Sequence, residues 1–199
     1  MLLPHQPPIL ANMNSDSLKN QILIAMPQLE DPNFDHSITY ILEHNEDGAM
    51  GLTLNRPVDI SYEDVLEDMD IEATAPIGVR HRIVVGGPVQ QEAGFILHPP
   101  TDTPYESTVP LLGDLYLTTS RDLLVDIAAG KGPSQSLMAL GYAGWSAGQL
   151  EAELAQNSWL SVAASTEIIF DVPFELRWQT AARSLGIDIN LLSSQAGHS

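Results

Sequence analysis

The sequence predicts a single α+β domain in which helices pack on a substantially antiparallel sheet. Several apolar runs of strand length are joined by hairpin-type turns, and strands then alternate with helices in the second half of the chain. The 199 residues suffice for one full hydrophobic core but not comfortably for two. We expect a loosely ordered arm over residues 1–17, the domain over 18–192 and a polar tail over 193–199.

The strands are predicted from short apolar runs that end at turn-forming residues. Residues 21–26 are a continuous apolar run stopped by Pro27, which is typical of a buried strand. A turn-rich stretch at 43–48 separates the next two runs and predicts a hairpin, and the proline-rich stretch 98–113 predicts a long irregular connection. The predicted strands cover residues 21–26, 37–43, 49–54, 82–85, 94–97, 114–118, 137–140, 159–163, 166–170 and 187–192.

The helices are predicted from their end signals and apolar stripes. Ser61 with an acid three residues later has the spacing of a capping box. Gly130 and Gly186 are placed to end helices, and Pro173 to begin one. The predicted helices cover residues 61–69, 120–130, 146–156 and 173–185.

Residues 141–154 carry the most distinctive pattern, which we interpret as a strand, a glycine turn and a helix. Ser146 and Gln149 have capping-box spacing, but residues 144–148 also spell G-x-S-x-G, the nucleophile elbow of serine hydrolases. That mechanism needs a later histidine within reach of the hydroxyl, and the only one available is His198, next to the chain end. We therefore predict that Ser146 caps a helix and is not a nucleophile, and we identify no catalytic residue.

Charge and composition limit the possible partners. There are 26 acidic and 8 basic residues, so direct DNA binding is disfavoured, because DNA affinity depends on Lys and Arg neutralising phosphates. Cysteine is absent, which excludes disulfides and thiolate metal sites, and the histidines lack the spacing of a metalloenzyme. No apolar run reaches membrane-helix length. We expect a cytoplasmic protein with no cofactor and no metal.

Seven residues near strand ends and turns are the candidates for a binding site. The positions share a polar or aromatic side chain, or a glycine that lets a ligand approach the backbone. Structural alternatives exist for each kind: a guanidinium paired with a carboxylate, a tight turn, a local histidine contact or a core aromatic ring. The candidates are His44, Asn55, Arg56, Gly86, Gly87, Tyr142 and Trp145.

Seven separated motifs, in order from about residue 18 to the end of the chain, resemble the YqgE/AlgH family of bacterial proteins. They are LIAMP at 23–27; EHN at 43–45 with GAMG at 48–51; NRP at 55–57; GGPV at 86–89; GFILH at 94–98; TTSRD at 118–122; and GYA at 141–143 with GQLE at 148–151.

The resemblance implies one domain with a bifurcated sheet rolled into a pseudo-barrel, in a bacterial cytosolic protein. It implies no established activity and supplies no catalytic set. A role in transcription has been suggested for the family, yet no helix-turn-helix is visible here. We expect a non-enzymatic protein that acts through contacts with an unknown protein partner, with regulation as one such role. The alternative is a small-molecule binding protein or enzyme whose site lies at the strand-end motifs.

Overall fold

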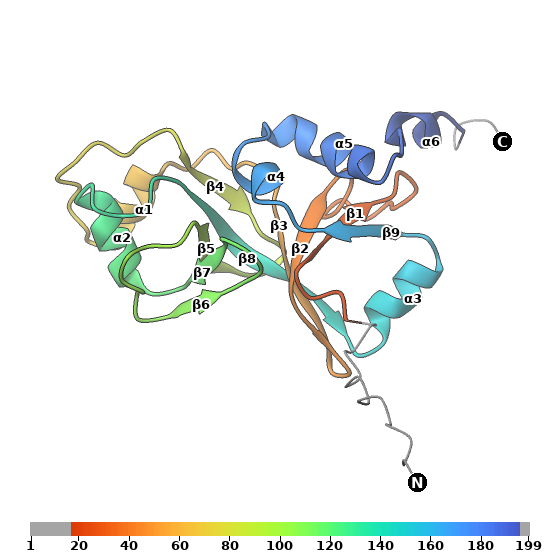
Figure 1. Ribbon diagram of the computed structural model, residues 1–199, viewed down its shortest axis with the longest axis horizontal. Helices are drawn as coiled ribbons and strands as arrows, with labels where there is room; N and C mark the ends of the chain where they lie inside the picture. The colour runs from red at the N-terminus through yellow and green to blue at the C-terminus, as the bar shows by residue number, and fades with distance from the viewer. Residues whose placement is uncertain (1–16, 196–199) are drawn as a thin grey trace, which may run out of the picture.

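The computed structural model describes residues 17–195, which form nine strands, six helices and their connections (Figure 1). The strands are β1 Gln21–Ala25, β2 Ile38–Asn45, β3 Gly48–Thr53, β4 His81–Val85, β5 Val89–His98, β6 Thr108–Pro110, β7 Tyr116–Thr118, β8 Ser136–Ser146 and β9 Trp159–Ala163. The helices are α1 Tyr62–Asp68, α2 Arg121–Ala128, α3 Gln149–Ala155, α4 Thr166–Phe170, α5 Phe174–Ser184 and α6 Ile189–Gln195.

The strands form one bifurcated, mostly antiparallel sheet with the order β6-β7-β5-β8-β3-β2-β1-β9, and β4 pairs with β8 off this path. The long strand β8 belongs to both branches. Its first half pairs with β4 in parallel and with β5, whereas residues 143–146 pair with β3. The sheet curls, so β8 runs from the branch with α1 and α2 to the branch with α3 and α5 (Figure 1). The predicted bifurcated, barrel-like architecture is confirmed.

The hydrophobic core follows the two branches. The largest cluster joins the inner residues of β1, β2 and β3 to α4 and α5, with Trp178 and Ala181 among its members. A second cluster lies under α1 and α2 and includes Leu66 and Leu124. A smaller one, with Trp145 and Trp159, packs under α3. Helix α5 therefore covers the first branch along one side, and α3 closes it at another (Figure 1).

Most predicted strands and helix ends are present, and three segments differ. Residues 166–170 form α4 and residues 189–195 form α6, whereas strands were predicted over 166–170 and 187–192. A short apolar run has no decisive period, and here Ile168, Ile169 and Phe170 are buried by one helical turn against the sheet. Helix α6 continues to Gln195, past the predicted boundary at residue 192. Strand β6 lies inside the predicted irregular connection.

The predicted glycine turn at 141–148 is also wrong in detail, because β8 continues through it to Ser146. Gly148, in the left-handed conformation at φ 74°, is the N-cap of α3. Ser146 therefore does not cap the helix; its backbone N–H and its hydroxyl both donate to the Gln149 side-chain oxygen. By contrast, the Ser61 capping box of α1 is confirmed, with Asp64 accepting from the Ser61 backbone.

Candidate functional site

The seven candidate residues fall in three places. Gly86 and Gly87 lie where the sheet divides, and they are needed for packing: a Cβ on Gly86 would stand 2.2 Å from the Gly141 carbonyl oxygen, and one on Gly87 would stand 2.1 Å from the Tyr142 carbonyl carbon. Tyr142 packs edge-on against Phe95. These contacts account for three of the candidates through close strand approach.

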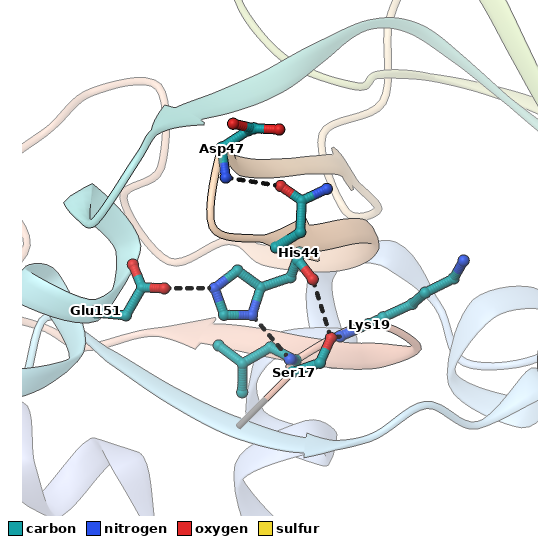
Figure 2. A network of polar contacts seen from close by, with 7 residues as sticks. Ser17, Lys19, His44, Asp47 and Glu151 are labelled. Carbon is teal, nitrogen blue, oxygen red and sulfur yellow. Dashed lines mark hydrogen bonds and ion pairs between the residues drawn. The ribbon is translucent and has the colours of Figure 1, made fainter. Parts of the chain in front are cut away.

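His44 belongs to a polar network at the β2–β3 hairpin (Figure 2). Its Nδ1 accepts from the Leu18 backbone N–H at 3.0 Å, and its Nε2 lies 2.8 Å from a Glu151 carboxylate oxygen. The Ser17 hydroxyl donates to the His44 carbonyl oxygen. Both ring nitrogens are occupied, so His44 ties the start of the domain to α3.

Trp145 is paired in the same region. Its indole N–H donates to Glu153 Oε2 at 2.9 Å, and the indole N–H of Trp159 donates to the same oxygen at 2.8 Å. The other Glu153 oxygen accepts from Gln149. We call His44, Trp145, Glu151, Glu153 and Trp159 the paired network, because each of these polar side chains has a partner within the fold.

Asn55 and Arg56 lie at the other end of β3. Asn55 accepts from the Ile38 backbone N–H and donates to the His36 carbonyl, so it holds the segment before β2 against the end of β3. Arg56 donates from Nη2 to the Asp35 carbonyl at 2.8 Å, while its Nε is buried without a hydrogen-bond partner.

These residues line a pocket of about 430 Å³ against α5, which we call the Arg56 pocket. The His36 ring packs on Trp178, with ring centroids 4.3 Å apart, and its Nδ1 contacts Asp35. Glu175 is an exposed carboxylate on the same wall. The pocket is lined by Asp35, His36, Asn55, Arg56, Phe174, Glu175, Trp178, Gln179 and Asn190.

Behind Phe174, a second arginine is completely buried. Arg177 donates from Nε to the Val172 carbonyl at 2.9 Å and from Nη1 to the Leu54 carbonyl at 2.5 Å, and its Nη2 has no partner. Its guanidinium carbon lies 4.4 Å from the Phe174 ring centroid, and that of Arg82 lies 5.3 Å from the same centroid. Burial, with a smaller contribution from the Arg82 charge, lowers the pKa of Arg177 to about 10.

We call Arg56, Arg82 and Arg177 the arginine cluster. Within residues 17–195, none of the three has a carboxylate oxygen within ion-pair distance, whereas Arg80 does, at 2.7 Å from Asp171. This is unexpected in a chain with a formal net charge of −18. A buried cation normally needs a counter-charge, because its desolvation is otherwise uncompensated. The cluster can therefore accept an anion.

Arg82 and Arg177 were missed in the sequence, although a signal was present. Arg177 lies three residues after Phe174 and four before Ala181, inside the apolar stripe of α5. Arg82 alternates with Val84, which is completely buried, so it points to an inner face of β4. A charged residue at a position where the helix or strand pattern expects an apolar one indicates a candidate functional site.

A second missed feature is a buried chain of hydroxyl groups beside β4. The Tyr62 hydroxyl lies 2.7 Å from the Ser136 hydroxyl, which lies 2.8 Å from Nδ1 of His81. In this series of hydrogen bonds, each hydroxyl proton has an acceptor if Tyr62 donates to Ser136 and Ser136 donates to Nδ1 of His81. The proton of the neutral His81 ring then lies on Nε2. Burial lowers the pKa of His81, which favours this neutral form.

Residues 17–195 contain no group of three or more His, Cys, Asp or Glu side chains placed to hold a metal ion. In the same range, no helix combines the length and the apolar character needed to cross a membrane. His198, the only histidine downstream of Ser146, lies outside the described residues.

The fold and the site define a single-domain protein of mixed α and β structure with a pocket beside α5 that Arg56 lines. The profile of the family described as AlgH-like matches residues 22–190, and the chain belongs to that family. A UPF0301 protein from Alcanivorax borkumensis is 58% identical over 187 residues, covering 94% of this chain and 99% of the relative. Another, from Pseudomonas fluorescens, is 51% identical over 188 residues, covering 94% and 98%.

Solved structures agree with this assignment. The solution structure of AlgH from Pseudomonas aeruginosa is similar at a TM-score of 0.72 and 48% identity, covering 96% of this chain and all of that one. A crystal structure of a protein from Corynebacterium diphtheriae has a TM-score of 0.69 at 19% identity, covering 89% and 92%, which shows the shared fold alone.

Proposed function

We propose that this protein binds a small molecule bearing an oxyanion, such as a carboxylate or phosphate group, at the arginine cluster. The observation that carries the proposal is the set of three guanidinium groups without carboxylate partners in a chain of net charge −18. Of the alternatives drawn from the sequence, ligand binding at the strand-end motif of Asn55 and Arg56 is thus favoured over a role through protein contacts alone.

The hydrogen-bonding geometry supports an anion as the ligand. Arg56 Nε and Arg177 Nη2 are buried donors without acceptors, and an unmade hydrogen bond of a buried charged group is costly. An oxyanion in the Arg56 pocket supplies an acceptor for Arg56 and a counter-charge for the cluster, and planar guanidinium groups suit carboxylate and phosphate oxygens. Asn55 holds the residues around Arg56 in place, so the pocket is already formed before a ligand enters.

The test is isothermal titration calorimetry with inorganic phosphate at low ionic strength. We expect Arg56→Gln to weaken binding by about tenfold to a hundredfold, because charge-assisted hydrogen bonds contribute roughly 1.5–3 kcal/mol. The matched control is Arg183→Gln, which removes the same charge from an exposed position on α5. Equal affinity of the wild type and Arg56→Gln would contradict the proposal.

We also propose, as a second function, docking of a basic protein partner on the acidic face around α1. Residues 59–72 contain seven acids and no base, and all seven side chains are exposed. Arg121 donates to the Met69 and Asp70 carbonyls at the end of α1. Any regulatory role in transcription would then act through protein contacts, since the net charge disfavours DNA.

A pull-down at about 0.15 M salt, a physiological ionic strength, tests this second function. A partner that is captured reproducibly by the wild type and lost in Glu63→Lys/Glu67→Lys supports it. Failure to capture any partner reproducibly counts against it.

A further inference from the structure

A second pocket, of about 310 Å³, adjoins the arginine cluster. Phe174 lines both pockets, and the chain itself connects them: Asn55 and Arg56 line the first, and the next two residues, Pro57 and Val58, line the second. Arg82, which packs on Phe174, also lines the second pocket. We call it the Tyr62 pocket.

One wall of the Tyr62 pocket is aliphatic. Val79 is 88% exposed and Ile60 is 45% exposed, so apolar surface faces water here without a covering segment from residues 17–195. Ile77 and Ile83 continue the same wall. Covering this surface with an aliphatic group would be favourable, at about 25 cal/mol per Å² of apolar area removed from water.

The positive charge of this pocket lies on β4. Arg82 supplies positive charge, and His81, held by the Ser136 hydroxyl, presents its second ring nitrogen as a donor. Glu63 is the one carboxylate among the lining residues, and it is exposed. Phe174 lines both pockets, so the cationic donors of the two pockets lie next to the aliphatic wall.

We propose that the ligand of the arginine cluster is an amphipathic anion, with its anionic head beside the pocket-lining residues Arg56 and Arg82 and an aliphatic chain along the Tyr62 pocket. This inference rests on the proposed function, since the head group is the same oxyanion. It adds the chemical class of the remainder of the ligand. The anionic head is inferred from charge complementarity with the arginines, and the aliphatic chain is inferred from the exposed aliphatic wall.

Chain length gives a direct test. The affinities of acetate, butyrate, hexanoate and octanoate should rise by about fourfold per added methylene while the chain still finds wall to cover, because each buried methylene contributes about 0.8 kcal/mol. Hexanamide, which keeps the chain and loses the charge, should bind at least tenfold more weakly than hexanoate. Each titration is made by calorimetry on the full chain.

Variants separate the two parts of the ligand. Ile60→Ser/Val79→Ser should lower octanoate affinity at least fivefold and leave phosphate affinity unchanged. The control is Leu112→Ser/Val109→Ser, which alters two exposed apolar residues elsewhere, at 54% and 52%. All four residues are exposed, so neither variant is expected to unfold.

The outcomes distinguish this inference from the function on which it rests. Phosphate binding that depends on Arg56, together with carboxylate affinities that do not increase with chain length, would overturn the amphipathic ligand and retain the anion site. If hexanamide binds as tightly as hexanoate, and affinity rises with chain length just as steeply in Arg56→Gln, the proposed placement of the head group would be overturned. Absence of binding by both phosphate and octanoate would overturn both proposals.

Discussion

The two ends of β3 treat polar side chains in opposite ways. At the hairpin end, carboxylates of α3 partner His44 Nε2 and both indole N–H groups, and His44 Nδ1 accepts from the Leu18 backbone N–H. At the other end, the arginine cluster leaves buried N–H groups of Arg56 and Arg177 without acceptors. Polar groups that find partners within the fold stabilise it, whereas we infer that cations without such partners are available to a ligand.

The largest effect is expected from breaking the paired network at its centre. Glu153→Ala removes the acceptor shared by the two largely buried indoles of Trp145 and Trp159. We expect a loss of about 2–4 kcal/mol in the free energy of unfolding, because an unpaired buried donor costs about 1–3 kcal/mol. Urea unfolding measures it, and a loss below 1 kcal/mol would show that water replaces the carboxylate.

A smaller effect is expected from acidification, through histidines outside the paired network. Burial lowers the pKa values of His81 and His98 in the folded chain. In the unfolded chain these residues take up protons near pH 6.5, before the folded chain does, so stability should fall as the pH drops below 6.5.

Urea unfolding at pH 7.5, 6.5 and 5.5 checks this prediction, and His81→Gln should reduce the slope below pH 6.5. If the wild type and the variant lose stability in parallel, His81 does not contribute to the pH dependence.

Glu151→Ala tests the edge of the paired network. Its carboxylate is 53% exposed, although the His44 side chain that it contacts is only 6% exposed. A hydrogen bond of this kind contributes about 0.5–1 kcal/mol. The unfolding free energy should therefore fall by less than in Glu153→Ala, and an equal or greater loss would place the centre of the network at His44.

The smallest change in stability is expected at the opposite end. Arg56→Gln loses one bond to the Asp35 carbonyl but also removes a buried N–H that has no partner. These effects offset each other, so the unfolding free energy in the absence of anions should change by no more than about 0.5 kcal/mol. A loss like that of Glu153→Ala would mean that Arg56 is primarily a structural residue.

The sequence allowed the fold to be predicted better than the site. Apolar runs and end signals located most strands and helices, but Ile168–Phe170 and Ile189–Leu192 are too short for their period to distinguish helix from strand. Ser146 has the right spacing for a cap, yet β8 extends through it and Gly148 takes that position. These outcomes depend on strand pairing and packing between distant segments, which are properties of the tertiary structure.

The site shows the same limit. Asn55 and Arg56 were candidates because they follow a strand, but whether a carboxylate reaches Arg56 depends on residues distant in sequence. Arg177 comes from α5, more than a hundred residues later, and donates to the Leu54 carbonyl beside Asn55. His44 and Trp145 had equally suggestive positions, and only their partners on α3 identify them as structural.

The most direct test of the contrast between the two ends is the Nε–Hε signal of Arg56 in a proton–nitrogen NMR spectrum during titration with phosphate. Arg56 Nε is buried without an acceptor, whereas Arg177 Nε already donates to the Val172 carbonyl, and Arg183 is exposed. We predict a large, saturable downfield shift for Arg56, a smaller one for Arg177 and none for Arg183. An Arg56 signal that stays fixed, or moves only as that of Arg183 does, would contradict an anion site at the arginine cluster.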